Sequence, residues 1–142
     1  MPRPTFDNLA PDKRQRFIDA ALDEFSARPY DQASISRIVA RLGIAKGSVY
    51  QYFDGKRDLF GWLVEEAGRR KVAMVTAAPA PEGADLFARL RWMYLQGLLF
   101  QARHPRWARL GLRVMEPSAD AHIDALRRQH VAAAQGLSLI HI

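Results

Sequence analysis

Hydroxyl-bearing and basic side chains gather between residues 34 and 57, and these residue types bond to phosphates and to the edges of nucleic-acid bases. Serine and tyrosine hydroxyls donate and accept hydrogen bonds, whereas lysine and arginine add positive charge. Among them lies Gly47, whose lack of a side chain lets another molecule come close to the backbone. The candidate binding residues are Ser34, Arg37, Lys46, Gly47, Ser48, Tyr50, Tyr52 and Lys56.

The positive charge of the chain is concentrated in this same segment. Residues 1–31 hold five basic and six acidic side chains, a net charge of −1, whereas residues 32–57 hold five basic and one acidic, a net charge of +4. The whole chain of 142 residues has 21 basic and 15 acidic side chains. An excess of basic side chains favours polyanionic partners such as nucleic acid, although charge alone does not identify the partner.

Other kinds of chemistry find little support in the sequence. The chain has no cysteine, which excludes disulfides, thiolate zinc sites and cysteine nucleophiles. It also has no His-Glu-x-x-His or Gly-x-Ser-x-Gly motif, and residues 43–48 do not have the spacing of a phosphate loop. His122 and His130 would lie about 12 Å apart along a helix, too far for one metal ion. We therefore expect no enzymatic activity, no metal site and no cofactor.

The composition indicates a folded, soluble protein of one domain or two small units. Hydrophobic residues make up 49% of the chain, which is enough for a core. Residues 1–5 lack the apolar run of a signal peptide, and no stretch approaches the roughly 18 apolar residues of a membrane span. We expect a cytoplasmic protein that does not contact a membrane.

The spacing of apolar residues predicts an all-α fold, because they recur every three or four positions and nowhere alternate over a long stretch. Two prolines and a glycine in residues 77–83 predict a break between two packed units. The expected helices cover residues 12–27, 34–42, 46–53, 56–77, 84–103, 105–115 and 118–135.

The second and third of these helices have the pattern of a helix-turn-helix. Ser34 is a good N-cap, and Gly43 is the residue type that ends a helix in the left-handed conformation. Val49 and Phe53 would face inward on the next helix, leaving its basic and hydroxyl side chains outside. This second helix is the one that enters the major groove of DNA. Core packing remains an alternative for Tyr50, and Arg41 and Arg57 are more simply explained as solvated charges.

The sequence of residues 34–60, SISRIVARLGIAKGSVYQYFDGKRDLF, closely resembles the DNA-binding signature of the tetracycline-repressor (TetR) family. The resemblance covers roughly residues 12–65. It is specific because the glycine turn, the Tyr-x-Tyr-Phe motif and the following lysine all stand in register, which a loose helix-turn-helix pattern does not require.

The resemblance implies a homodimeric transcriptional regulator, usually a repressor, that leaves a palindromic operator in double-stranded DNA when a small-molecule effector enters the C-terminal domain. It also implies a domain division: a helix-turn-helix DNA-binding domain at residues 1–55, a connecting helix at 56–77 and a partial C-terminal helical regulatory domain at 84–142. Positions that face bases in this family match Lys46, Gly47 and Tyr50, and positions near phosphates match Ser34, Arg37, Ser48, Tyr52 and Lys56.

Two residues depart from the family pattern. Pro29 stands where the family often has glycine. Ala45 stands where a serine often caps the recognition helix, so this helix loses a side-chain cap typically worth ~1 kcal/mol. Neither departure removes the resemblance.

The second helical unit is the expected site of the effector. Residues 84–103 are apolar around much of their circumference, which predicts a central helix covered on several sides. Trp92, Met93, Phe100 and Trp107 are candidates for lining a ligand cavity. Packing in the core is the simpler explanation for each of them, and no charged group identifies the ligand.

Beyond residue 65 the resemblance is architectural. The two long helices that form the dimer interface in this family have no counterpart in these residues, and residues 136–142 depart from the pattern before them, so we expect a truncated or frame-altered terminus. The rival function is a helical ligand-binding or protein-interaction module that keeps the helix-turn-helix only as a scaffold, without specific DNA binding.

Overall fold

The computed structural model describes the backbone of residues 1–140 and the side chains of residues 1–132, and its described part is all-α, as the sequence predicts. The expectation about residues 136–142 therefore concerns side chains outside those described. The elements are α1 (Pro4–Asp7), α2 (Pro11–Ala27), the 3-10 turn η1 (Tyr30–Gln32), α3 (Ile35–Leu42), α4 (Lys46–Tyr50), α5 (Lys56–Ala77), α6 (Leu86–Arg103), α7 (Pro105–Val114) and α8 (Ala121–Ile140).

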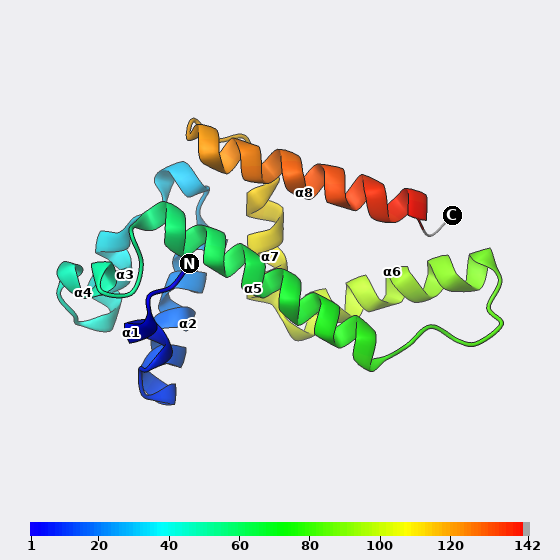
Figure 1. The fold of residues 1–142 in the computed structure, drawn as a ribbon, viewed down its shortest axis with the longest axis horizontal. Helices are drawn as coiled ribbons and strands as arrows, with labels where there is room; N and C mark the ends of the chain where they lie inside the picture. The colour runs from blue at the N-terminus through cyan, green and yellow to red at the C-terminus, as the bar shows by residue number, and fades with distance from the viewer. Residues whose placement is uncertain (141–142) are drawn as a thin grey trace.

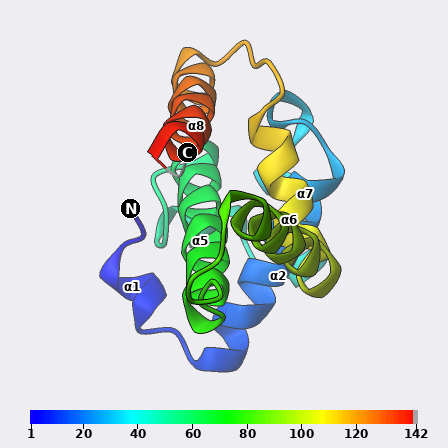
Figure 2. The same ribbon diagram turned by 90° about the vertical axis from the view of Figure 1, so that its right-hand side faces the viewer.

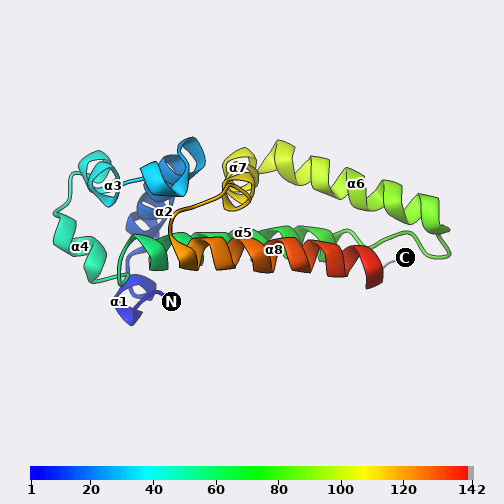
Figure 3. The ribbon, with the colours of Figure 1, turned by 90° about the horizontal axis from the view of Figure 1, so that it is seen from above.

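The short helices α3 and α4 lie at one end of the molecule, and the loop before α6 lies at the other (Figure 1). The long helix α5 leads from the first end toward the second. Helix α7 lies between the two ends and packs against α2, α5, α6 and α8. Seen from above, α6 lies apart from α8 (Figure 3), whereas it contacts α5. Figure 2 shows α7 beside α2, so the second helical unit rests directly on the first.

The boundaries of the helix-turn-helix follow from local signals that the sequence carries. The Ser34 hydroxyl oxygen accepts a hydrogen bond from the backbone N–H of Ser36 at 3.1 Å and so caps α3. Gly43 ends that helix with φ +66°, a left-handed conformation that glycine adopts without steric cost. Val49 and Phe53 are fully buried, as predicted.

An N-terminal segment that the sequence patterns do not single out completes the core of this unit. The side chain of Phe6 on α1 is fully buried, and its ring centroid lies 4.9 Å from that of Phe53 and 5.2 Å from that of Trp62. The backbone N–H of Arg3 donates to the carbonyl of Tyr52 at 2.8 Å. The α1 segment thus holds the chain that follows α4 against the core.

Two helices have ends that differ from the predicted ones by three residues or more. The predicted helix 46–53 ends at Tyr50. Beyond it the backbone makes hydrogen bonds that span three residues, such as that from the N–H of Tyr52 to the carbonyl of Val49, as in a 3-10 turn. The predicted helix 118–135 begins at Ala121 and runs to Ile140. Its start is set by Asp120, whose carboxylate accepts from the N–H of His122 at 2.9 Å.

Helix α6 corrects a further expectation, that of a central helix covered on several sides. Within the described residues Phe100 is its one buried side chain, whereas the side chains of Phe87 and Tyr94 are 80% and 70% exposed. The prediction was wrong because apolar composition shows what a helix could bury and not what lies next to it. Other large apolar side chains of α6 that are exposed are Leu86, Leu90, Met93, Leu95, Leu98 and Leu99.

No helix in the described part of the chain is long and apolar enough to cross a bilayer.

Candidate nucleic-acid interface

Helix α4 presents the three residues predicted to face bases on its outer side. Lys46 and Gly47 are exposed, and Tyr50 is 44% exposed, which argues against the alternative of core packing for this tyrosine. On the opposite side of the same helix Val49 is fully buried. Ala45 precedes α4 without a side-chain cap, as its residue type requires. The arrangement leaves a lysine, a bare backbone position and a phenol together on one exposed helix face.

Three of the residues predicted to lie near phosphates converge on the turn between α2 and α3. The ammonium of Lys56, at the start of α5, donates to the carbonyls of Tyr30 and Ala33 at 3.0 and 3.2 Å and lies over the Tyr30 ring. The guanidinium of Arg37 donates to the carbonyl of Gln32 in the same turn. Ser34, the N-cap of α3, follows this turn directly. The positive charges of Arg37 and Lys56 are therefore fixed by backbone carbonyls close to the N-terminus of α3.

The other two phosphate-facing candidates lie nearer the core. Ser48 is half-buried on α4. Tyr52 is also half-buried, and its ring centroid lies 5.6 Å from that of Phe17 and 5.9 Å from that of Phe6. Packing therefore accounts for the tyrosine ring, and the predicted phosphate contacts of both hydroxyls stay predictions.

A buried carboxylate that sequence patterns did not reveal organises this region. The side chain of Glu24 on α2 is 2% exposed. Its Oε1 accepts from the N–H of Ser34 at 3.0 Å and from Nε of Arg37 at 2.7 Å, and its Oε2 accepts from Nη1 of Arg28 at 3.0 Å. The one hint in the sequence is that position 24 continues the apolar stripe of α2, where an acidic residue must find partners if it is buried.

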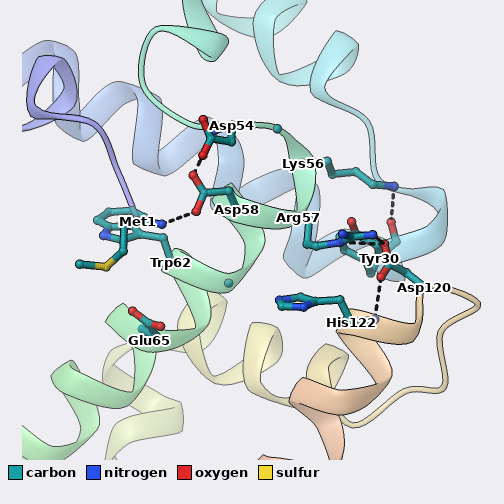
Figure 4. Close-up of a pocket in the computed structure, with 12 residues that line it drawn as sticks. Met1, Tyr30, Asp54, Lys56, Arg57, Asp58, Trp62, Glu65, Asp120 and His122 are labelled. Atoms are coloured by element: carbon teal, nitrogen blue, oxygen red, sulfur yellow. Dashed lines mark hydrogen bonds and ion pairs between the residues drawn. The ribbon is translucent and has the colours of Figure 1, made fainter.

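The turn between α7 and α8 contacts the predicted DNA-binding unit (residues 1–55) and the start of α5 through charged groups. Asp31 accepts from the hydroxyl of Ser118 at 2.6 Å and from the N–H of Ala119 at 3.0 Å, and Arg57 donates to Asp120 at 2.8 Å. Figure 4 shows Lys56, Arg57 and Asp120 gathered around Tyr30. These hydrogen bonds lower the pKa of Asp31 and of Asp120 below their ordinary value. For the mostly buried Tyr30, desolvation raises the pKa of the phenol, and the charge of Asp120 adds to this effect.

The four residues predicted to line an effector cavity differ in their burial. Phe100 and Trp107 are buried in the core, Trp92 is half-buried and Met93 is exposed. The guanidinium of Arg70 lies over the Trp107 ring, 4.6 Å from its centroid, and so covers one face of the ring. None of the four lines either of two surface hollows of the described chain, one beside Tyr30 and one beside Ile18. Their role in effector binding stays a prediction.

Comparison with known proteins gives a consistent result for the helix-turn-helix. Residues 17–61 match the family model described as bacterial regulatory proteins, tetR family. The HTH-type transcriptional regulator SrpR of Pseudomonas putida is 40% identical over 50 residues, which are 35% of this chain and 24% of SrpR. An HTH-type transcriptional repressor of Mycobacterium tuberculosis is 32% identical over 76 residues, 54% of this chain and 40% of that protein.

The fold agrees over nearly the whole chain. The crystal structure of a TetR family transcriptional regulator from Chloroflexus aurantiacus superposes with a TM-score of 0.81 and 38% identity, covering 96% of this chain and 64% of that one. The chain thus spans about a quarter of SrpR and under two thirds of the Chloroflexus regulator. Residues 17–61 are thus similar to the tetR family of bacterial regulatory proteins, and the chain has the fold of a TetR-family regulator over 96% of its length.

Proposed function

We propose that this protein is a sequence-specific DNA-binding transcriptional regulator, a repressor that a small-molecule effector releases from a palindromic operator. The observation that carries the proposal is the outer face of α4, where Lys46, Gly47 and Tyr50 stand exposed over a buried Val49. A helix with this face can enter the major groove, where lysine and tyrosine reach base edges. The relatives named above, which are regulators and a repressor, support the same function.

The proposal includes a homodimer. A two-fold dimer presents two recognition helices about 34 Å or a multiple of that distance apart, and an operator that matches it is a palindrome. Helix α5 joins the DNA-binding unit to the second unit, and α7 rests on α2. An effector that favours one arrangement of these helices over another would change the spacing of the recognition helices and so lower the affinity for the operator.

Selection of bound duplexes from a random DNA pool tests the proposal. The selection is run with the full chain at two salt concentrations, and the oligomeric mass is measured in parallel. A palindromic motif recovered at both salt concentrations, together with a dimeric mass, supports the proposal. Binding that is lost at high salt and yields no motif, from a monomer, contradicts it and favours the rival interaction module.

A further inference from the structure

The buried carboxylate of Glu24 contacts Ser34 and Arg37, two residues that the resemblance to the TetR family places near phosphates. One of its oxygens accepts from both the backbone N–H of Ser34 and Nε of Arg37. A carboxylate that is 2% exposed is stable only where hydrogen bonds replace its lost water, and here three donors do so. Glu24 therefore fixes both the N-terminus of α3 and the direction in which the Arg37 side chain leaves that helix.

The two contacts made by Arg37 leave one edge of its guanidinium available. Nε is bound to Glu24 and Nη2 to the carbonyl of Gln32, whereas Nη1 makes no hydrogen bond within the described part of the chain. The side chain is 48% exposed although it is held at two points. A free arginine loses about 1.5–2 kcal/mol of rotamer freedom on being ordered. Because this one is ordered in advance, most of that loss does not have to occur on contact with a ligand.

The place of this edge points to a phosphate. Arg37 lies one turn beyond the Ser34 cap, on the first helix of the helix-turn-helix, which crosses the DNA backbone in this motif. Lys56 lies on the other side of the same turn. A guanidinium with a free N–H edge matches a phosphate oxygen in geometry and in charge.

We infer that Glu24 is a positioning residue for DNA binding, which orients Arg37 so that its Nη1 edge donates to a backbone phosphate. This inference rests on the proposed function and adds to it a residue that does not itself touch DNA. Glu24 thus has two distinct effects. Its hydrogen bond to Ser34 stabilises the fold, and its hydrogen bond to Arg37 orients that side chain for the phosphate contact.

The salt dependence of DNA binding separates these effects. Each phosphate contact that is lost makes the slope of log K against log salt less steep by about 0.9. The affinity of the full chain for a fluorescent duplex of random sequence is measured over a salt series. Arg37→Gln is expected to lower the slope by about 0.9. Glu24→Leu, which has no acceptor, is expected to lower it by the same amount, and the double variant no further.

Two control variants keep the test specific. Arg28→Gln removes the partner of the other Glu24 oxygen and leaves the contact with Arg37, so its slope should equal that of the unmodified chain. Arg109→Gln removes an exposed charge outside the DNA-binding unit and should also leave the slope unchanged. If Glu24→Leu does not fold, Glu24→Met replaces it, since methionine also lacks an oxygen acceptor for Arg37 and its flexible side chain adapts to the same buried space.

The possible results are distinct. A Glu24 variant that is folded but less stable, and that binds DNA with the unmodified slope, would show a purely structural role and overturn the inference. An unchanged slope for Arg37→Gln would overturn it too, because Arg37 would then touch no phosphate. If the unmodified chain showed no salt-dependent DNA binding, the proposed function itself would fail, a result that is distinguishable from the other two.

Discussion

Arg106 on α7 donates to the carboxylate of Asp23 on α2 at 2.9 Å, although 83 residues separate them in sequence. The other end of the same guanidinium donates to Asp19 at 2.7 Å. Asp23 is also paired, at 3.1 Å, with Arg41 of α3. A single carboxylate thus lies between the second helical unit and the first helix of the helix-turn-helix, so α7 is connected to the DNA-binding unit by charge as well as by apolar packing.

The apolar contact of α7 should contribute more stability than this ion pair. Arg106 and Asp23 side chains are 43% and 40% exposed, and ion pairs this open to solvent contribute less than about 1 kcal/mol. Leu110 on the same helix is fully buried, and its replacement by alanine should cost about 2–5 kcal/mol. Denaturant unfolding of Arg106→Ala and Leu110→Ala measures both. Equal losses for the two variants would mean that solvent does not screen the ion pair.

The N-terminal segment should be essential to the stability of the DNA-binding unit. Phe6 is fully buried among four aromatic rings, so Phe6→Ala is expected to lower the free energy of unfolding by about 3–5 kcal/mol. Phe87→Ala is the matched control, because that ring is 80% exposed and its loss should change stability by less than about 0.5 kcal/mol. A small effect of Phe6→Ala would show that α1 is not part of the folded core.

The parts of the fold that sequence could predict are those set by neighbours along the chain. The inward positions of Val49 and Phe53, the Ser34 cap and the Gly43 turn all depend on residues within one or two helical turns, and the structure confirms them. The exposed position of Lys46, Gly47 and Tyr50 follows in the same way, from the burial of Val49 on the opposite side of α4.

The remaining features depend on residues distant in sequence, and spacing does not encode such contacts. Nothing in residues 1–10 shows that Phe6 packs against Phe53. The position of Glu24 in the sequence likewise does not show that it binds Arg37. Nor does the position of Arg106 on α7 show that folding brings it to Asp23 of α2. The tyrosine and lysine types at positions 52 and 56 predicted phosphate contacts, yet both side chains also make contacts within the fold.

The base-facing residues should affect discrimination between DNA sequences, and the phosphate-facing ones should not. Lys46→Ala and Tyr50→Ala are expected to reduce the preference for the selected operator over a scrambled duplex by about 1–3 kcal/mol each. Lys56→Ala should weaken binding to both duplexes alike, and it should also lower stability because two carbonyl contacts are lost. Titrations with the two duplexes measure these effects. Equal losses of discrimination in all three variants would contradict the assignment.

The contact between the α7–α8 turn and the DNA-binding unit should weaken in acid. Hydrogen bonds hold the pKa of Asp31 and of Asp120 below the ordinary value of 3.8. A depressed carboxyl pKa stabilises the fold at pH values above the unfolded pKa, and this stabilisation is lost as the pH falls through the lower, folded pKa. Carboxyl carbon NMR should therefore place both midpoints below 3.8.

A matched variant identifies the cause of the shift at Asp120. Arg57→Gln removes the donor that contributes most to it, so the pKa of Asp120 should rise toward its ordinary value. The pKa of Asp31 should stay low in the same variant, because Ser118 and Ala119 hold it. A rise in both pKa values would indicate that the whole turn has detached from the DNA-binding unit.

Replacing Gly47 by alanine should have opposite effects on the stability of the protein and on its affinity for DNA. A Cβ atom built at this position in α4 meets no atom of the described chain within 4 Å, so alanine is free of steric cost. Alanine is also favoured over glycine in a helix by up to about 1 kcal/mol, and Gly47→Ala should therefore make the protein more stable. If the backbone of α4 closely approaches DNA, however, the added methyl group should lower operator affinity about tenfold or more.

Gly43→Ala is the control, and its effects should run the other way. Gly43 has φ +66°, so alanine there should cost about 1 kcal/mol of stability while the folded protein keeps its operator affinity. Thermal unfolding and DNA titration of both variants give the four values required. A Gly47→Ala protein with unchanged operator affinity would mean that the α4 backbone stays at a distance from the DNA. In that case only long side chains such as Lys46 and Tyr50 would reach the bases.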